Sequence, residues 1–543
     1  MKGIISLFLL FAIFVGLFGC AKPVELPKDL SGKYNLNTDR NEAIVDDSGI
    51  ITVSNSGNAR VFYHIFVGSF SDSNGDGIGD LRGIINRFDY LNDGDDNSGV
   101  SLGVEGIWLS PIFLSPSYHK YDTTNYYKID PQFGTMEDLQ ELIELCHSRN
   151  VQIILDLVIN HTSRANSWFQ QFMSAHQKGD TSDPYYDFYT WVETKEAGAT
   201  YYSLQGSSHY YEGNFSSDMP ELNFDNDDVR TAMVDLAKFY LDMGVDGFRF
   251  DAAKYIYYND PGKSVDFWNW YMDKLRNIKP DIYTVAEVWD ADGATFPYFQ
   301  STNCFNFSMS QSSGKIAAAA KGGNVNTFTH YIDGYLDSIT AQNPNAMMVS
   351  FIANHDTDRA AGFLTTAGGY AYMAANLSIL LPGSTFIYYG EEIGMLGSRG
   401  GANTDANRRL AMLWGDEDTV KNPIGSTYKA EQINGTVLDQ LPDGNSLYNH
   451  YKKLIAIRKA NPEIAYGDFG ALTTTGKYGG FVSTYEGNTV MVLHNTTNET
   501  VTIDLSQWSS YQISTLAAYV GLGKATLNGT TLTLDGQTSV VLR

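Results

Sequence analysis

The residues best suited to chemistry in this sequence are carboxylates and histidines that follow short apolar runs. Residues two apart share one face of a strand, so Arg249 and Asp251 should point the same way, and a guanidinium beside a carboxylate favours its ionised form. Glu287 ends the apolar stretch 283–286, where a carboxyl can have a raised pKa and donate a proton. Two carboxylates in such different environments form the acid and nucleophile pair of glycoside hydrolysis.

Four apolar runs open onto polar residues of this kind. They end in Asp156, Asn160 and His161; in Arg249 and Asp251; in Glu287; and in Asn354, His355 and Asp356. These runs belong to an alternation of strand-like and helix-like stretches from about residue 60 to 455, which is typical of a parallel α/β fold. In a TIM barrel the active site lies at the C-terminal ends of the strands. The pattern therefore predicts a (β/α)8 barrel rather than an open sheet with a glycine-rich phosphate loop, which we do not find in the sequence.

One unit of the alternation illustrates the prediction. Residues 106–110 form a strand-like run, Thr135–Asp138 begins a helix with a capping-box pattern, and 151–158 is almost wholly apolar. Leu139, Leu142, Ile143 and Cys146 recur at helical spacing, which predicts that Cys146 is a buried small residue rather than half of a disulfide.

The barrel pattern is interrupted once and followed by a different one. Residues 162–224 are long, polar and tyrosine-rich, which indicates an inserted subdomain after the third strand, between barrel segments 59–161 and 225–460. From 461 to 543, short Thr- and Gly-rich strands such as Gly480–Tyr485 and Thr489–His494 predict an antiparallel β-sandwich.

The N-terminus predicts export. Lys2 precedes an apolar run from Ile4 to Phe18, which is shorter than the roughly 20 residues of a membrane-spanning helix. The run ends in Leu17-Phe18-Gly19-Cys20, which resembles the bacterial lipoprotein cleavage box. That resemblance implies a signal peptide over 1–19, a lipidated Cys20, a tether within 20–58 and a place on the outer or periplasmic side of the cell envelope. An ordinary signal peptide with an incidental cysteine is the alternative.

Charge narrows the range of partners. The formal net charge is −25, and nucleic-acid binding relies on basic patches, so we expect no nucleic-acid partner. A neutral sugar is steered little by this charge, which serves solubility. We expect a monomer that meets a membrane only through the lipid anchor.

A second motif has the spacing of a calcium loop. Asp72, Asn74, Asp76 and Asp80 stand at loop positions 1, 3, 5 and 9, with a glycine at 6 and the Ile78 backbone carbonyl at 7. Position 12 is Gly83 rather than glutamate, so the motif is not a full EF-hand. A solvated acidic turn is the alternative.

Six blocks of the sequence resemble the α-amylase family of glycoside hydrolases, in the family's order. They are Gly106–Pro111, Asp156–His161, Gly247–Lys254, Ala286–Trp289, Phe351–Asp356 and Tyr388–Gly394. The resemblance covers nearly all of the exported chain. It implies the barrel and a starch-like α-glucan substrate.

The resemblance also implies roles for individual residues. It makes Asp251 the nucleophile, Glu287 the general acid and then base, and Asp356 the carboxylate that grips the reacting sugar and stabilises its positive charge. It makes Tyr121, Asp122, His161, Arg249 and His355 further groups around that sugar, and Lys254 a contact on the leaving side. Loops like 72–80 hold structural calcium in relatives of the oligo-1,6-glucosidase type. For the amylases' other calcium, Asn160 is in place but Tyr255 stands where many members have histidine.

Two details bear on which linkage is cut. Ala252 follows the nucleophile, and Met219–Asn223 lies between the motifs of oligo-1,6-glucosidases and neopullulanases. We expect endo-type α-1,4 cleavage of starch and maltooligosaccharides, with some action on pullulan or cyclodextrin and some transfer. An α-glucosidase or glycosyltransferring relative and a non-catalytic starch-binding lipoprotein are the alternatives, and the latter usually lacks one of the three carboxylates.

Overall fold

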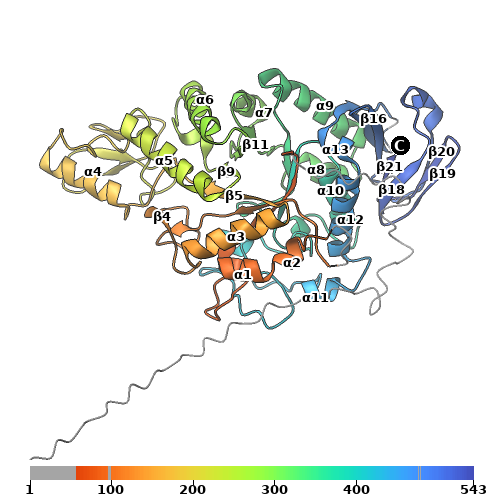
Figure 1. The fold of residues 1–543 in the computed structure, drawn as a ribbon, viewed down its shortest axis with the longest axis horizontal. Coiled ribbons are helices and arrows are strands. Elements are labelled where there is room, and N and C mark those ends of the chain that lie inside the picture. Colours follow the sequence, from red (N-terminus) through yellow and green to blue (C-terminus); the bar gives the residue numbers. More distant parts are fainter. Residues whose placement is uncertain (1–56, 96–99, 475, 477) are drawn as a thin grey trace, which may run out of the picture.

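The computed structural model describes residues 57–95, 100–474, 476 and 478–543. In Figure 1 a central barrel lies between a lobe containing α4 (Ser167–Lys178) and a blue C-terminal domain. The predicted signal peptide, Cys20 and nearly all of the predicted tether lie outside the described residues. Within the described part, no helix is long and apolar enough to cross a membrane.

Eight parallel strands form the barrel and confirm the predicted fold class. The sheet order is β11-β10-β9-β5-β2-β1-β13-β12, and a parallel bridge between Phe305 and Val349 links its two ends. The strands are β1 (Val61–Ile65), β2 (Gly106–Leu109), β5 (Gln152–Leu157), β9 (Gly247–Phe250), β10 (Tyr283–Ala286), β11 (Asn303–Cys304), β12 (Val349–Phe351) and β13 (Ser384–Tyr388).

The strands are buried because helices cover them outside and side chains fill the barrel inside. Every residue of β2, β9, β10, β12 and β13 is buried, as a parallel sheet with both faces covered requires. At Gly247 a Cβ atom would lie 1.7 Å from the carbonyl oxygen of Tyr283, so only glycine allows β9 and β10 to approach this closely.

Helices follow the barrel strands in alternation. α3 (Met136–Ser148) begins with the predicted capping box, in which Thr135 and Asp138 cap each other, and it buries Leu139, Leu142, Ile143 and Cys146 as predicted. The other helices outside the insertion are α1 (Leu81–Asn86), α2 (Phe88–Leu91), α5 (Asp227–Met243), α6 (Pro261–Ile278), α7 (Asp292–Thr295), α8 (Lys315–Ala320), α9 (Val325–Gln342), α10 (Tyr370–Ile379), α11 (Val437–Gln440), α12 (Leu447–Ala460) and α13 (Pro462–Tyr466).

The predicted insertion has its own secondary structure. Between β5, the third barrel strand, and α5 the chain forms α4 (Ser167–Lys178) and an antiparallel sheet in the order β6-β8-β7 (Trp191–Val192, Tyr210–Glu212, Tyr201–Ser203). A short hairpin of β3 (Phe113–Leu114) and β4 (Asn125–Ile129) follows β2. These two segments rise from neighbouring strand ends and form one side of the cleft described below.

The C-terminal domain consists of two antiparallel sheets. One has the order β14-β15-β16-β21-β18 (Asp468–Ala471, Gly479–Tyr485, Asn488–Asn495, Thr538–Leu542, Leu516–Gly521), and the other β17-β20-β19 (Val501–Asp504, Thr531–Leu534, Ala525–Asn528). β15 and β16 match the two predicted strands within one residue. The domain boundaries themselves stay predictions.

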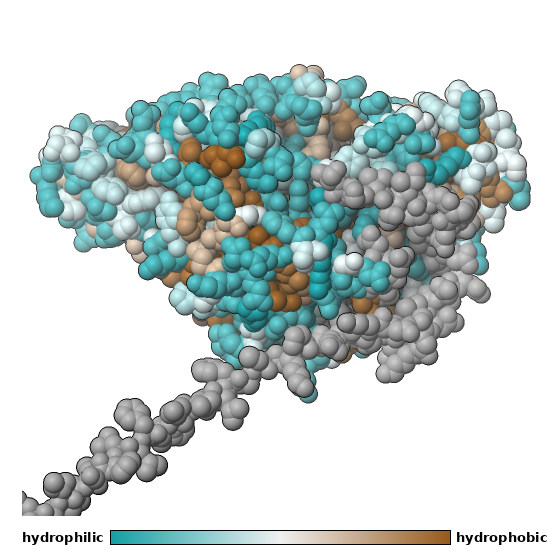
Figure 2. Space-filling model, viewed as in Figure 1, coloured by the Kyte–Doolittle hydropathy of each residue, from teal (hydrophilic) through white to brown (hydrophobic). Residues whose placement is uncertain are grey.

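The visible surface is mostly hydrophilic. Figure 2 shows hydrophobic residues gathered in several small patches between hydrophilic ones. Both described cysteines, Cys146 and Cys304, are buried and free, as expected for Cys146.

Candidate active site

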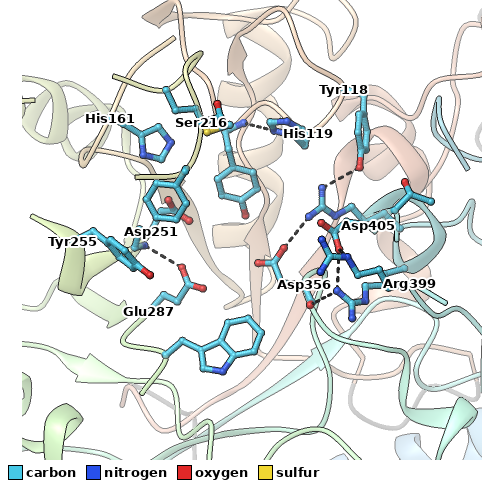
Figure 3. A pocket seen from close by; sticks show the side chains of 18 of the residues that line it. Tyr118, His119, His161, Ser216, Asp251, Tyr255, Glu287, Asp356, Arg399 and Asp405 are labelled. Atoms are coloured by element: carbon cyan, nitrogen blue, oxygen red, sulfur yellow. Dashed lines mark hydrogen bonds and ion pairs between the residues drawn. The ribbon is translucent and has the colours of Figure 1, made fainter. Parts of the chain in front are cut away.

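A cavity of about 1030 Å³ opens at the C-terminal ends of the barrel strands. Asp251, Glu287 and Asp356, which the sequence singled out as catalytic, all line it, and in Figure 3 their side chains converge on its centre. They follow β9, β10 and β12, so the parallel sheet brings together residues far apart in the chain.

One guanidinium holds the first two carboxylates. Arg249 Nη1 lies 2.7 Å from Asp251 Oδ1, and Nη2 lies 2.8 Å from Glu287 Oε2. Nη1 also donates to both oxygens of Asp156, at 2.8 and 3.0 Å. Arg249 and Asp156 are buried beneath the cavity and do not line it, so Arg249 positions the acidic groups rather than contacting a ligand there.

Burial is the main influence on the protonation of Asp251 and Glu287. It raises the pKa of Asp251 to about 6, although Arg249 opposes the shift, and it raises the pKa of Glu287 to about 7, with Asp251 and Asp356 adding to the rise. Arg249 favours the ionised form of Asp251, as expected, but the removal of the carboxylate from water outweighs this one cation. Glu287 still holds its proton to a higher pH than Asp251.

The backbone after Asp251 is strained. Ala252 has a φ of 48°, a left-handed conformation that costs a non-glycine residue about 1–2 kcal/mol. This turn points the Ala252 amide at Glu287, to whose Oε2 it donates at 3.0 Å. The turn after Asp251 thus holds the Glu287 carboxyl near Asp251 through this hydrogen bond.

Asp356 has different partners. Arg409 Nη2 lies 2.8 Å from Asp356 Oδ1, and His355 Nε2 lies 3.0 Å from Oδ2. Burial raises the pKa of Asp356, but His355 and the cations Arg409 and Arg249 outweigh burial and hold that pKa well below its usual range. Asp356 is therefore an anion throughout the working pH range.

Some of the residues predicted to contact the sugar line the cavity, and others lie behind its surface. Tyr121 lines the cavity, donates to Asp156 Oδ2 at 2.9 Å and lies 2.6 Å from His355 Nε2, whereas His355 itself lies behind the surface of the cavity. His161 lines the cavity, and its Nε2 is buried. Burial lowers the pKa of His161 to about 4, which keeps it neutral.

Asp122 does not line the cavity. Its Oδ1 accepts hydrogen bonds from the hydroxyls of Ser115, at 2.7 Å, and of Ser117. Direct contact between Asp122 and a sugar therefore stays a prediction. Lys254 does line the cavity, and its Nζ is held by the Trp289 carbonyl at 2.8 Å and by Asp290 Oδ2 at 3.1 Å.

Several lining residues escaped the sequence analysis. Trp289 and Phe215 expose 39% and 44% of their surface at the cavity, which suits stacking on the apolar face of a sugar ring. His119 stands two residues before Tyr121, and burial lowers its pKa to about 4. Arg409 lies in an irregular stretch after β13, where the only sequence signal is the pair Arg408-Arg409.

The predicted calcium loop is built from successive turns. Asp72 Oδ1, Asn74 Oδ1 and Asp76 Oδ1 each accept a hydrogen bond from the backbone amide two residues later, at 3.0, 3.0 and 2.8 Å. Gly77, at the predicted glycine position, has a φ of 92° that disfavours any other residue. The turns line up side-chain oxygens, which are the ligands calcium takes.

Asp80, at the last predicted ligand position, is already hydrogen-bonded through both of its carboxylate oxygens. Its Oδ1 caps α1 by accepting from the Gly83 amide at 2.6 Å, and its Oδ2 accepts from the Ser73 amide and hydroxyl at 3.1 and 2.9 Å. Among the described residues, no group of three or more His, Cys, Asp or Glu side chains is placed to hold a metal. Asp80 would have to exchange these partners before it could bind a cation.

Two residues expected to lie near the amylases' other calcium have partners within the protein. Asn160 bonds to the buried Glu221, whose pKa burial raises to about 8. Tyr255, in place of histidine, puts its ring against Phe215 with centroids 4.8 Å apart.

Comparison with known proteins agrees with this geometry. Residues 64–467 match the family model for the α-amylase catalytic domain, and residues 479–541 match that for the α-amylase SusG C-terminal domain. Alpha-amylase 3 of Dictyoglomus thermophilum is 37% identical over 447 residues, which cover 80% of this chain and 84% of that protein. The cyclomaltodextrinase of Thermoanaerobacter pseudethanolicus is 30% identical over 439 residues, covering 79% and 65%.

Solved structures show the same likeness. Amy13B of Eubacterium rectale superposes with a TM-score of 0.84 at 33% identity, covering 92% of this chain and 97% of that one. The α-amylase from H. orenii superposes with a TM-score of 0.78 at 33% identity, covering 89% and 99%. Fold, catalytic carboxylates and sequence therefore agree that this chain belongs to the α-amylase family and is a glycoside hydrolase.

Proposed function

We propose that this enzyme hydrolyses α-1,4-glucosidic bonds of starch and maltooligosaccharides with retention of configuration. The observation that carries the proposal is the Arg249 guanidinium, which contacts Asp251 and Glu287 at 2.7 and 2.8 Å and so keeps the two carboxyls close. A retaining enzyme needs its carboxyls about 5–5.5 Å apart, because one of them attacks the sugar directly.

The reaction follows from the protonation order. Asp251, the more acidic of the two, attacks the anomeric carbon while Glu287 gives its proton to the departing glycosidic oxygen. The covalent glycosyl-enzyme is then opened by a water whose proton passes to Glu287, and the Asp251 carboxylate is restored. Another sugar hydroxyl in place of that water gives transfer instead of hydrolysis.

The other groups recognise the reacting sugar and the leaving chain. Asp356, held as an anion by Arg409, stabilises the positive charge that develops on the sugar. His161 and Tyr121 offer hydrogen bonds to its hydroxyls. Lys254, Trp289 and Phe215 line the part of the cavity next to Glu287, where the leaving glucan would lie.

The names of relatives leave the substrate range open. They include oligo-1,6-glucosidase and 4-alpha-glucanotransferase beside α-amylase and cyclomaltodextrinase. We include action on pullulan and cyclodextrin in the proposal. The three carboxylates in their ion-paired setting support catalysis over a binding-only role.

Two further parts of the proposal concern stability and location. Calcium, held by the oxygens of Asp72, Asn74 and Asp76 and by the Ile78 carbonyl, would cross-link the turn that leads into α1. Lipidation at Cys20 would tie the enzyme to the cell envelope by a tether that precedes the barrel.

The test is to identify the first products. Proton NMR of maltoheptaose hydrolysis should show the α-anomer before mutarotation, and chromatography should show cleavage of starch. The Glu287→Gln variant serves as the inactive control. A β-anomer as first product would refute retention, and products from none of starch, pullulan, cyclodextrin or maltoheptaose would refute the proposed substrate class.

A further inference from the structure

Trp108, a buried residue of β2, connects the apolar interior of the barrel to the catalytic centre. It belongs to the apolar cluster inside the barrel, where its ring packs against Phe305 and Phe386 with centroids 5.6 and 6.0 Å apart. The same ring faces Arg249, whose Cζ lies 5.2 Å from its centroid. Trp108 does not line the catalytic cavity, so any effect that it has on the reaction passes through its neighbours.

Arg249 has partners of two kinds. Its nitrogens form ion pairs, Nη1 with Asp251 at 2.7 Å and Nη2 with Glu287 at 2.8 Å. Its Cζ lies over the Trp108 ring, within the roughly 6 Å of a cation–π interaction, which is strongest where water is excluded. Both Arg249 and Trp108 are buried, so the cation has an aromatic partner as well as anionic ones in a dry environment.

The ion pairs alone do not fix the plane of the guanidinium. The group could turn about the line through Nη1 and Nη2, which keeps both nitrogens near their carboxylates but swings the N–H bonds away from the carboxylate oxygens. Hydrogen bonds weaken as they depart from a straight line, so this rotation would loosen the hold on Asp251 and Glu287. The rotation also moves Cζ away from the position that the Trp108 ring favours. The indole therefore opposes a movement that the ion pairs permit.

His64 supports the indole ring of Trp108. The two rings stack with centroids 3.4 Å apart and an angle of 11° between their planes, and the two residues are register partners on β1 and β2. β1 and β9 lie on opposite sides of β2 in the barrel sheet, so His64 and Arg249 approach Trp108 from opposite sides. Burial lowers the pKa of His64 well below its usual value, and His355 and Arg249 lower it further, so the ring is neutral and does not repel Arg249.

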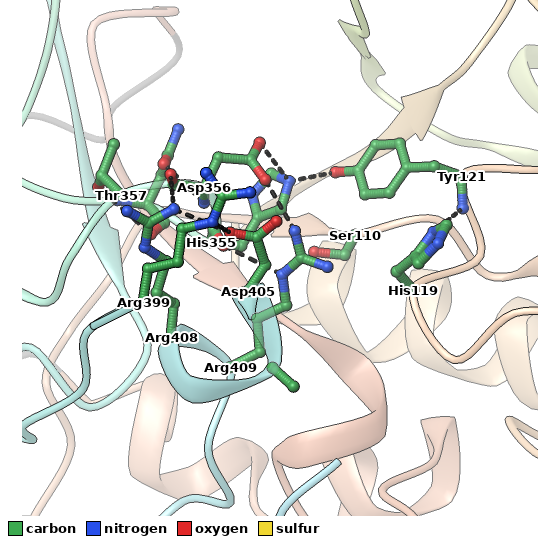
Figure 4. Close-up of polar contacts among 12 residues, drawn as sticks. Ser110, His119, Tyr121, His355, Asp356, Thr357, Arg399, Asp405, Arg408 and Arg409 are labelled. Carbon is green, nitrogen blue, oxygen red and sulfur yellow. Dashed lines mark hydrogen bonds and ion pairs between the residues drawn. The ribbon is translucent and has the colours of Figure 1, made fainter. Parts of the chain in front are cut away.

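A second aromatic ring near Arg249 belongs to the cavity itself. The Tyr121 ring centroid lies 5.8 Å from Arg249 Cζ. The Tyr121 hydroxyl lies 2.6 Å from His355 Nε2, and Figure 4 shows that this nitrogen also meets Asp356, at 3.0 Å. Because Tyr121 lines the cavity, a change there would alter contacts with the substrate as well as with the cation. Trp108 can be changed without altering the lining of the cavity, so it gives the cleaner test.

We propose that Trp108, supported by His64, is a positioning residue that holds Arg249 in the orientation required to grip Asp251 and Glu287. The inference rests on the proposed function and goes beyond it, because it assigns part of the reaction rate to a residue that the substrate does not touch. Arg249 lowers the pKa of Asp251 through its charge and its hydrogen bond, against the larger effect of burial. A loosened Arg249 should therefore raise that pKa, which a merely structural role of Trp108 would not do.

The test is the pH dependence of maltoheptaose hydrolysis. In Trp108→Leu the acidic side of the kcat/KM profile should move to higher pH by about one unit, the lower end of what an adjacent cation contributes to the pKa of a carboxyl. The value of kcat should fall about tenfold with little change in KM, because the carboxyls are misplaced while the lining of the cavity is kept. Trp108→Phe keeps an aromatic face for Arg249, and its acidic side should stay in place.

Phe62→Leu is the matched control. It shortens another buried ring of the barrel interior, which packs against Tyr283 and Phe386 with centroids 4.6 and 4.7 Å away. Like Trp108→Leu it should lower Tm, but it should leave the pH profile unmoved. An unmoved acidic side in folded Trp108→Leu, or an equal shift in Trp108→Phe or in Phe62→Leu, would overturn the inference.

If Trp108→Leu does not fold, His64→Leu decides the question. It removes the ring stacked on the indole, so the acidic side should move in the same direction by a smaller amount. A profile identical to that of the unmutated enzyme would overturn the inference while leaving α-1,4 hydrolysis intact. An unmutated enzyme that is inactive on maltoheptaose would instead refute the proposed function.

Discussion

The pKa order of Asp251 and Glu287 sets the pH dependence of hydrolysis. Their values of about 6 and about 7 mean that kcat/KM should rise through the first and fall through the second, since Asp251 must be ionised and Glu287 protonated. Hydrolysis should therefore be fastest between these two values, near about pH 6.5, and should slow on both sides of them.

The Glu287→Gln variant distinguishes the acidic side of the pH profile from its alkaline side. On maltoheptaose this variant should lose about 10²–10⁴-fold, because the departing oxygen no longer receives a proton. On an α-glucosyl fluoride, whose leaving group needs no proton, formation of the intermediate should recover in part. The rise through about 6 should persist there, and the fall through about 7 should vanish with the carboxyl that caused it.

The assay is initial-rate fluoride release and reducing-end formation from about pH 4.5 to 9. Glu212→Gln changes a buried glutamate of the insertion that does not line the cavity, and it should keep both limbs. A fall through about 7 that survives in Glu287→Gln would refute the assignment of the acid. An acidic limb far below about 6 would contradict the dominance of burial at Asp251.

Three further predictions concern the nucleophile, the metal and the anchor. Asp251→Asn should lose about 10⁴-fold or more and gain nothing from the fluoride, and recovery there would reverse the two roles. Calcium at a hundredfold excess over its dissociation constant should add about 2.7 kcal/mol to the free energy of unfolding, so chelation should lower Tm. Asp76→Ala should remove that response while Asp273→Ala, at an exposed position of α6, keeps it; identical melting curves with and without chelator would exclude the site. Cys20→Ala should release the enzyme from membrane fractions or leave its signal uncleaved, and a processed variant that still sediments with membranes would exclude the anchor.

The strand ends could be predicted because their signal is local. Asp156, Asp251, Glu287 and Asp356 each follow an apolar run, and parallel topology alone brings such ends together. The capping box could be predicted for the same reason, since Thr135 and Asp138 stand three residues apart.

The cavity residues Arg409 and His119 could not be predicted, because no local sequence pattern marks them. Arg409 meets Asp356 only after the long irregular stretch beyond β13 folds back, and His119 lies in a turn without periodicity. The strength of burial at Asp251 was also missed, because desolvation depends on the whole surrounding structure. The spacing of Asp72 to Asp80 likewise indicated a loop of side-chain oxygens but not that Asp80 caps α1, because that role depends on how the loop meets the helix.

Because Asp251 and Glu287 share the Arg249 guanidinium and lie close together, the proposed mechanism couples the pKa of Glu287 to the chemical state of Asp251. Asp251 raises the pKa of Glu287 only while it carries a negative charge. Once the sugar is bonded to Asp251, the ester is neutral and that repulsion ends, so the pKa of Glu287 falls just when it must accept a proton from water. Hydrolysis of the ester restores the negative charge of Asp251. The pKa of Glu287 then rises again, so that this carboxyl is protonated for the next turnover.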